Sequence, residues 1–195
     1  MSDSSRGASA PPLRRLIGIV GSPGVGKSTL AEGLAAADPT AAVLPMDGFH
    51  FPQARLVELG RRERMGAPDT FDVDSLVATL QLLRQSAEDA IISAPGFDRT
   101  IEEPVPDGIT IGRGIRTIYV EGNYLLLWDA VTELLDESWY LRLDEKVRRE
   151  RLVARHVTFG KTPQEASAWV AAVDEPNARL IEASATRATR ILAVD

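Results

Sequence analysis

The sequence predicts an α/β fold of three layers, α/β/α, with a mainly parallel sheet in the centre. Short apolar segments alternate with helical segments along the chain, and this alternation favours parallel strands joined by crossover helices. A glycine-rich loop between the first strand and the first helix favours the same architecture. The 195 residues are enough for one such domain with a substantial core and too few for two of ordinary size.

The glycine-rich loop, Gly21-Ser22-Pro23-Gly24-Val25-Gly26-Lys27-Ser28, matches the complete Walker A pattern GxxxxGK[ST]. In such a loop, backbone N–H groups surround phosphate oxygens, the lysine reaches the β- and γ-phosphates, and the serine hydroxyl ligates Mg²⁺. It lies between an apolar strand predicted at 16–20 and a helix predicted at 28–37, whose positive dipole end adds to the same site. These features predict a P-loop NTPase that binds ATP and Mg²⁺. The predicted nucleotide-binding residues are Gly21, Ser22, Pro23, Gly24, Val25, Gly26, Lys27, Ser28 and Thr29.

Six further segments have the apolar character of strands. They are residues 42–46, 90–93, 109–111, 117–120, 139–143 and 190–194. The segment 90–93 runs into Pro95-Gly96, and 109–111 alternates as half of a small hairpin would. Ligands of parallel sheets bind beyond the carboxyl ends of the strands. The residues predicted at that edge are Gly21, Asp47, Glu121 and Asp144.

Helices are predicted between these strands. Asp72 can cap a helix whose apolar residues share one face. Residues 146–156 form a strongly basic helix, and Thr162-Pro163-Gln164-Glu165 is a capping box that opens another. Earlier in the chain, residues 47–50 are expected to form a loop, and a polar, arginine-rich stretch then continues to Pro68.

Two carboxylates at strand ends are candidates for catalysis. Asp47 could accept the proton of an attacking hydroxyl as a general base, or assist Mg²⁺; the alternative is a turn residue, because Asp-Gly is a common turn pair. Glu121 could hold Mg²⁺ directly or through water; the alternative is a strand-end carboxylate that faces solvent.

The basic helix places Arg148, Arg151 and Arg155 on one face. They could stabilise the charge that develops on a transferred phosphoryl group; the alternative is a solvated, salt-bridged face. Arg149 is better explained as the i,i+4 partner of Glu145.

The only histidines, His50 and His156, lie in separate segments and form no metal signature. His50 is a candidate for substrate contact because it is close to Asp47, and His156 is expected on the surface.

Several of these segments together resemble the phosphoribulokinase/uridine kinase/pantothenate kinase family of P-loop kinases, over residues 15–194. The similarity is greatest to a bacterial branch labelled uridine-kinase-like or sugar-kinase-like. The segments are the P-loop, 46–50 (MDGFH), 64–72 (RMGAPDTFD), 95–99 (PGFDR), 120–127 (VEGNYLLL), the arginine helix and 176–182 (PNARLIE).

This resemblance implies ATP-dependent phosphorylation of a hydroxyl on a small molecule. It implies Asp47 as the catalytic base, Glu121 with Ser28 at the magnesium site, and an Arg-bearing helical lid at 148–155. The segment around Asn177 and Arg179 would approach the nucleotide base. The residues implied for the acceptor pocket are Phe49, His50, Phe97, Asp98 and Arg99.

The expected function is therefore transfer of the γ-phosphoryl group of MgATP to a sugar, nucleoside or pantothenate-like acceptor. Uridine kinases usually have a Tyr near the position of Phe97 and then a His, and this chain has neither, which argues against a pyrimidine nucleoside. One alternative is a nucleoside monophosphate kinase; another is a regulatory nucleotide-binding protein without transfer activity. A GTPase is disfavoured because no NKxD signature is present. The residues that could bind an acceptor phosphate are Arg55, Arg61, Arg62 and Arg64.

Charge and composition limit the binding partners and the cellular location that are expected. The net charge of −6 disfavours nucleic-acid binding, and no apolar run approaches the 18 residues of a membrane span. The absence of cysteine is consistent with the cytoplasm. Residues 1–12 are predicted to be a disordered lead-in, and 13–195 a single kinase domain. The resemblance leaves a homodimer open.

Overall fold

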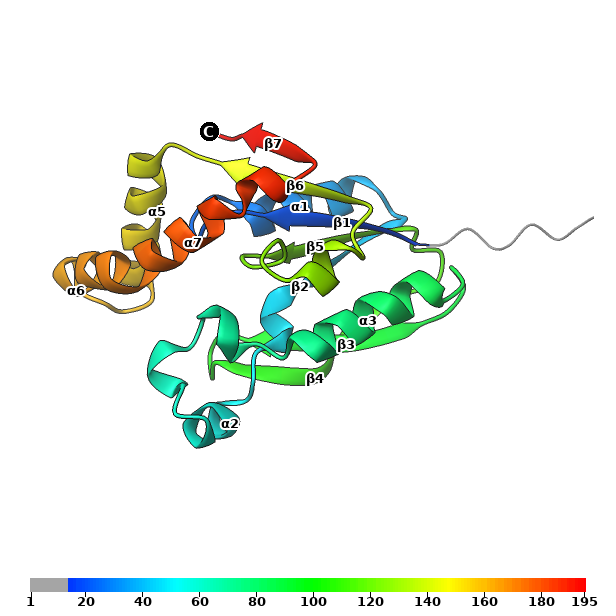
Figure 1. Cartoon of the computed structure of the whole chain (residues 1–195), viewed down its shortest axis with the longest axis horizontal. Helices are drawn as coiled ribbons and strands as arrows, with labels where there is room; N and C mark the ends of the chain where they lie inside the picture. The colour runs from blue at the N-terminus through cyan, green and yellow to red at the C-terminus, as the bar shows by residue number, and fades with distance from the viewer. Residues whose placement is uncertain (1–13) are drawn as a thin grey trace, which may run out of the picture.

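The computed structural model describes residues 14–195, so the lead-in predicted at 1–12 lies outside the described residues (Figure 1). Its main sheet has five parallel strands in the order β2-β5-β1-β6-β7. This confirms the mainly parallel sheet that the alternation predicted. The strands are β1 (Arg15–Val20), β2 (Ala41–Pro45), β5 (Thr117–Gly122), β6 (Glu137–Arg142) and β7 (Arg190–Ala193).

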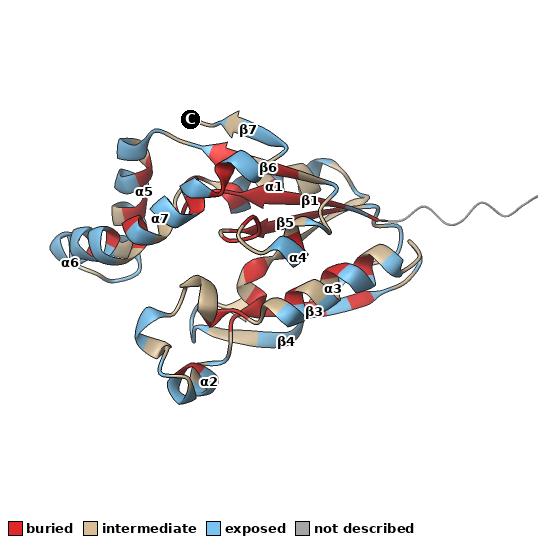
Figure 2. Cartoon of the chain, viewed as in Figure 1, coloured by how far each residue is buried: buried red, intermediate tan, exposed pale blue. Residues whose placement is uncertain are grey.

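Both faces of the sheet are covered, which gives the three layers. Ile17 and Ile19 of β1 pack with Ala31 of α1 (Lys27–Ala37). Leu16 and Val20 point the other way, because successive side chains of a strand alternate, and lie in the core that includes α3 (Val73–Gln85) and α7 (Glu175–Ala183). Figure 2 shows β1 and β5 buried along most of their length. Each buried Leu or Ile contributes about 1.5–3 kcal/mol, so these two strands fix the centre of the fold.

The segment 90–93 is longer than predicted and lies outside the main sheet. It belongs to β3 (Ile92–Asp98), which pairs antiparallel with β4 (Glu103–Ile111). The predicted segment stopped at Ser93, but the strand continues through Pro95 and Gly96, where a register shift between Ala94 and Gly96 accommodates them. This hairpin packs closely against the turn that carries Asp47: a Cβ on Gly48 would lie 2.1 Å from the carbonyl oxygen of Pro95, so only glycine allows this approach.

Two predictions of irregular structure also need correction. Residues 47–50 were predicted to be a loop, but Met46–Phe49 forms the 3₁₀ turn η1. The arginine-rich stretch contains the short helix α2 (Gln53–Glu58), and α4 (Asp129–Thr132) follows β5. Helices of six and four residues are too short to show a 3.6-residue periodicity, so the sequence pattern could not reveal them.

The basic helix is α5 (Glu145–Thr158), and Asp144 caps it by accepting from the N–H groups of Lys146 and Val147. The capping box at Thr162 opens α6 (Pro163–Trp169) as predicted. A π-helical turn, Val170–Asp174, then joins α6 to α7. In Figure 1, α5 and α6 lie beyond the arrowheads of the central strands, as expected for elements that cover the ligand edge.

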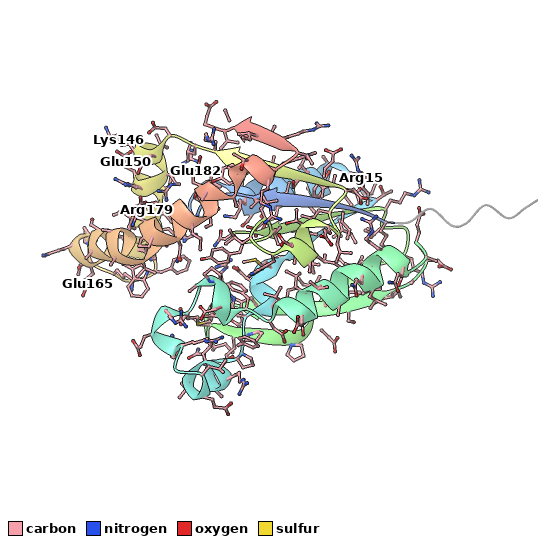
Figure 3. The ribbon with its side chains drawn as sticks, in the orientation of Figure 1. Arg15, Lys146, Glu150, Glu165, Arg179 and Glu182 are labelled. Atoms are coloured by element: carbon pink, nitrogen blue, oxygen red, sulfur yellow. The ribbon has the colours of Figure 1, made fainter. Side chains whose placement is uncertain are left out.

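Figure 3 shows Arg179 and Glu182 on α7, and Lys146 and Glu150 at the outer end of α5. None of the helices in residues 14–195 combines the length and the apolar character that crossing a bilayer requires.

Candidate active site

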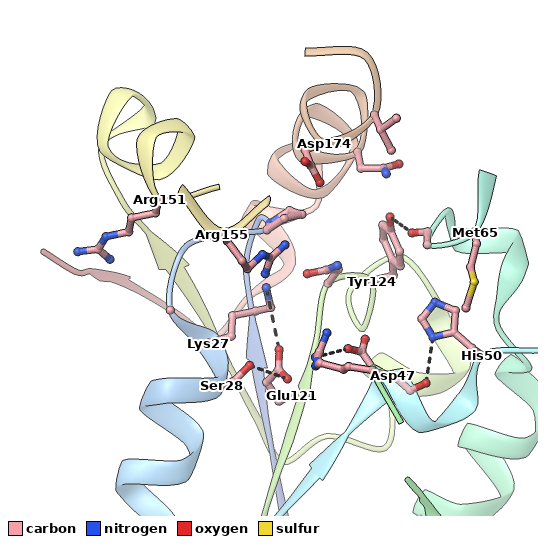
Figure 4. A pocket seen from close by; sticks show the side chains of 18 of the residues that line it. Lys27, Ser28, Asp47, His50, Met65, Glu121, Tyr124, Arg151, Arg155 and Asp174 are labelled. Atoms are coloured by element: carbon pink, nitrogen blue, oxygen red, sulfur yellow. Dashed lines mark hydrogen bonds and ion pairs between the residues drawn. The ribbon is translucent and has the colours of Figure 1, made fainter. Parts of the chain in front are cut away.

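A cavity of about 460 Å³ lies at the carboxyl edge of the main sheet, where the strand-end residues were predicted to meet (Figure 4). The P-loop lines it through Pro23, Gly24, Gly26, Lys27, Ser28 and Thr29. Asp47, His50, Arg99 and Glu121 line the same cavity. The remaining lining residues are Met65, Gly66, Phe71, Asn123, Tyr124, Arg151, Arg155, Trp169, Val173, Asp174 and Asn177.

The P-loop has the backbone that the Walker A pattern requires. Gly24 (φ 85°) and Gly26 (φ 95°) adopt left-handed conformations, which glycine enters without steric cost. A Cβ on Gly24 would also lie 2.8 Å from Leu152 of α5. Gly26 begins α1 without a side-chain cap, so the first N–H groups of that helix remain available to an anion.

The other P-loop residues form the back of the loop. A Cβ on Gly21 would lie 2.8 Å from the carbonyl oxygen of Leu141, and Val25 is buried in the core on the α1 side of the sheet. The Ser22 hydroxyl donates to the carbonyl oxygen of Ala178 at 3.5 Å. These three residues shape the loop from behind and do not line the cavity.

Lys27 is buried, and its ammonium is weakly paired. Nζ donates to the carbonyl oxygen of Ser22 at 3.3 Å and lies 4.0 Å from Oε1 of Glu121. Burial lowers the pKa of Lys27, because the charged form loses hydration. A nucleotide phosphate would supply a closer opposite charge than Glu121 does.

Ser28 and Glu121 lie together and supply oxygen atoms that suit Mg²⁺. Ser28 Oγ donates to Oε2 of Glu121 at 3.3 Å. Burial raises the pKa of Glu121, so a cation beside this carboxylate would stabilise its ionised form. Within residues 14–195, no cluster of three or more His, Cys, Asp and Glu side chains forms a metal site. Mg²⁺ held by one or two protein oxygens, phosphate oxygens and water is common in kinases, and these residues fit that pattern.

Asp47 lies next to Glu121 because of the strand register. Pro45, near the end of β2, pairs with Glu121 in β5, and η1 then carries Asp47 into the cavity. Oδ2 of Asp47 accepts from Nη2 of Arg99 at 2.7 Å. Arg99 follows β3 directly, so the hairpin supplies the partner of this carboxylate.

The five residues implied for the acceptor pocket divide into two groups. His50 and Arg99 line the cavity, whereas Phe97 packs against the His50 ring from behind at a centroid distance of 5.1 Å. Phe49 is part of the hydrophobic core. Asp98 accepts from the N–H of Thr100 at 2.8 Å, so it stabilises the hairpin turn.

Of the three arginines predicted on one face of α5, two line the cavity and one does not. Arg151 and Arg155 line the cavity, and Arg151 donates to the carbonyl oxygen of Asp195. Arg155 forms no ion pair within residues 14–195. Arg148, predicted to act with them, does not line this cavity: its side chain is 7% exposed and is ion-paired with Glu175.

Arg148 and Glu175 join α5 and α7 to the P-loop. Arg148 also donates to the carbonyl oxygen of Pro23 at 3.4 Å, and Glu175 accepts from Arg149 at 2.8 Å. Burial opposes ionisation of Glu175, but the hydrogen bonds from Arg149 and Arg148 outweigh it and lower the pKa of Glu175. Arg149 also pairs with Glu145, as the i,i+4 spacing predicted.

Replacing Glu175 with Gln is expected to lower the free energy of unfolding by about 3 kcal/mol, because it leaves the buried Arg148 without an opposite charge. Urea denaturation measures this change. Glu145→Gln is the control: its pair with Arg149 is exposed and should contribute less than about 1 kcal/mol. Equal effects of the two substitutions would contradict a special role of the buried pair.

The sequence reasoning missed several lining residues. Asn123 and Tyr124 follow β5, and Tyr124 donates to the carbonyl oxygen of Gly66 at 2.7 Å.

Asp174, another lining residue, accepts from Nε2 of His156 at 2.9 Å. The prediction of a surface position for His156 was therefore wrong: this residue is partly buried beside the π-helical turn. Asn177 lines the cavity, whereas Arg179 lies in a second cavity on the other side of the P-loop.

This fold and this cavity define the class of protein: a P-loop kinase. No protein-family model matches the chain, but individual proteins do. The ATP-dependent kinase-like protein notR' of Aspergillus versicolor is 41% identical over 133 residues, which are 63% of this chain and 77% of that protein. A Schizosaccharomyces pombe protein named "putative uridine kinase C227.14" is 37% identical over 161 residues, 75% of this chain and 68% of that protein.

A crystal structure from Silicibacter sp. TM1040, titled "putative fructose transport system kinase", superimposes with a TM-score of 0.86 at 34% identity and covers 93% of this chain and 90% of that chain. The chain belongs to the phosphoribulokinase/uridine kinase/pantothenate kinase family of P-loop kinases. It is a phosphotransferase that acts on a nucleotide and a small molecule with a hydroxyl group.

Proposed function

We propose that the protein transfers the γ-phosphoryl group of MgATP to a hydroxyl of a sugar, nucleoside or pantothenate-like small molecule, with Asp47 as the general base. The observation that carries this proposal is the convergence of Lys27, Glu121 and Asp47 in one cavity. The first two suit the phosphates and Mg²⁺. Asp47 is a carboxylate on the side away from the P-loop, where an acceptor hydroxyl would bind.

In the proposed step, Asp47 takes the proton of the acceptor hydroxyl, and the hydroxyl oxygen forms a bond to the γ-phosphorus. The bond from that phosphorus to the bridging oxygen of ADP breaks. Arg99 already occupies Oδ2 of Asp47, which leaves Oδ1 to receive the proton. Lys27, Arg151 and Arg155 would stabilise the charge on the transferred group, which is the main contribution of a protein to phosphoryl transfer.

Mg²⁺, when bound, neutralises charge on the β- and γ-phosphates. Ser28 and Glu121 are the residues that would hold it. The lid would exclude water once the nucleotide is in place, since hydrolysis competes with transfer in an open site.

The alternative of a nucleoside monophosphate kinase has less support. Arg55, Arg61, Arg62 and Arg64 do not line the cavity, and each is paired with a carboxylate: Glu58, Asp69, Glu102 and Asp69, respectively. A phosphate on the acceptor would have to displace these pairs.

ADP release coupled to NADH oxidation, with MgATP and a panel of sugars, nucleosides, vitamins and nucleoside monophosphates, tests the proposal. We expect ADP release that depends on the acceptor. When EDTA removes Mg²⁺, ADP measured directly by chromatography should no longer form. The crystal structure named for fructose transport is a reason to include ketohexoses. ATP binding without stimulation by any acceptor would instead favour a regulatory nucleotide-binding protein.

A further inference from the structure

His50 is held in one orientation at the acceptor side of the cavity. Its ring packs on Phe71 at a centroid distance of 3.8 Å and on Phe97 at 5.1 Å. Nδ1 lies 2.9 Å from the carbonyl oxygen of Asp47. Because Asp47 and His50 belong to the same tight turn, the ring and the proposed catalytic carboxylate are fixed relative to each other.

This geometry determines the tautomer of His50. A carbonyl oxygen only accepts hydrogen bonds, so Nδ1 must carry the proton. Burial lowers the pKa of His50, which favours the neutral ring. In a neutral imidazole protonated on Nδ1, Nε2 is an acceptor.

Nε2 of His50 is available to a ligand. No hydrogen bond to this atom is formed by residues 14–195, and Arg14 Nη1 is the single side-chain nitrogen or oxygen of that range that is both buried and unpaired. Nε2 is therefore accessible, and His50 lines the cavity (Figure 4). Asp47 and His50 thus offer two hydrogen-bond acceptors in one cavity, and a ligand that engages both must donate twice.

The acceptor side also lacks a cation for an anionic substrate. Its one arginine, Arg99, is paired with Asp47. The other cations of the cavity, Lys27, Arg151 and Arg155, come from the P-loop and from α5, where the proposed function uses them for ATP. On this side, Asp47 adds negative charge to the cavity, which disfavours a phosphate or carboxylate on the acceptor next to it.

We propose that the acceptor is an uncharged sugar or polyol, and that His50 Nε2 accepts a hydrogen bond from a second hydroxyl close to the one that is phosphorylated. The inference rests on the proposed function, because it assumes that Asp47 receives the proton of the first hydroxyl. His50 is then a specificity-determining residue: it selects vicinal hydroxyls over a single one.

Matched pairs of acceptors test the charge. Glycerol, D-ribose, D-fructose and panthenol are compared with D-glycerate, D-ribose 5-phosphate, D-fructose 6-phosphate and pantothenate, respectively, in the ADP-release assay. We expect turnover with an uncharged member and a kcat/KM at least about tenfold lower for its anionic counterpart. A preference for an anionic member would overturn the inference and leave the kinase function standing. Turnover with no member of either set would count against both.

Two variants test His50 itself. In His50→Asn the amide N–H can replace Nδ1 but nothing replaces Nε2; in His50→Gln the amide oxygen can replace Nε2. With the preferred acceptor, His50→Asn is expected to lower kcat/KM by about 10- to 100-fold, and His50→Gln by less. The analogue that lacks the second hydroxyl is 2-deoxy-D-ribose for D-ribose, or 1,3-propanediol for glycerol. With this analogue, the kcat/KM of His50→Asn should be close to that of the wild type, because the hydrogen bond to Nε2 is already absent.

An equal loss with both the acceptor and its deoxy analogue would overturn the assignment, because it would show that the variant damages the site in general. MgATP affinity measured by calorimetry provides the second readout. It should match the wild-type value in both variants, since His50 is separated from the P-loop by the catalytic carboxylate. A loss of MgATP binding together with turnover would likewise contradict a role confined to the acceptor.

Discussion

Asp47→Asn is expected to lower kcat by about a thousandfold, within the range that general-base catalysis contributes. The amide has nearly the shape of the carboxylate but cannot take the proton of an acceptor hydroxyl. Asp47 lies beyond Glu121 as seen from the P-loop (Figure 4), so MgATP affinity should remain within about twofold. Stopped-flow or coupled assays give kcat, and titration calorimetry gives the affinity.

Asp74→Asn is the matched control, because Asp74 is an exposed residue in the first turn of α3 and should leave kcat unchanged. The Asp47 variant also loses the ion pair with Arg99, but the Arg99 side chain is 66% exposed, so solvent screens the pair and it should contribute about 1 kcal/mol or less to stability. A variant that folds, binds MgATP and keeps more than a tenth of the wild-type kcat would remove Asp47 from the role of base.

The fold could be predicted because its central strands are apolar on both faces. β1 and β5 are buried along most of their length, and such segments stand out in a sequence. The hairpin could not be predicted in full, because β4 is mostly exposed and contains Pro104, Pro106 and Gly108, which are rare inside strands. The strand β3 continues past Pro95 only because of the register shift with β4, which depends on its partner.

The P-loop could be predicted because its residues are contiguous. The meeting of Asp47 and Glu121 followed from the rule that the carboxyl ends of parallel strands share an edge, and the Pro45–Glu121 register places them there. The rest of the cavity comes from segments far apart in the chain. Trp169 and Asp174 carry no local pattern that separates them from other residues of their helices, so only tertiary structure brings them to the site.

Arg148 shows the limit of helical periodicity. The spacing correctly grouped it with Arg151 and Arg155 on one face of α5. The position of Glu175, which lies 27 residues later in the sequence, decides which of the three is held away from the cavity. Helical periodicity predicts which residues share a face of a helix, but it does not predict which residues of other elements pack against that face.

Lys27→Ala is expected to lower kcat/KM by about a hundred- to a thousandfold, the usual effect of removing one group that stabilises transition-state charge. The buried ammonium has no carboxylate closer than Glu121 at 4.0 Å, so little of its charge is neutralised before the nucleotide binds. The γ-phosphoryl group would be its natural partner. Both MgATP affinity and kcat should fall, since the lysine contacts the phosphates before and during transfer.

Lys146→Ala separates this effect from a general loss of positive charge. Lys146 is 85% exposed at the outer end of α5 and is expected to leave kcat/KM unchanged. Because burial already penalises the charge of Lys27, its removal relieves that penalty, and the variant should melt within a few degrees of the wild type. A Lys27→Ala protein with a normal Tm and full activity would contradict the assignment of the P-loop. A protein with a normal Tm and greatly reduced transfer would confirm that the lysine is retained for its charge and not for stability.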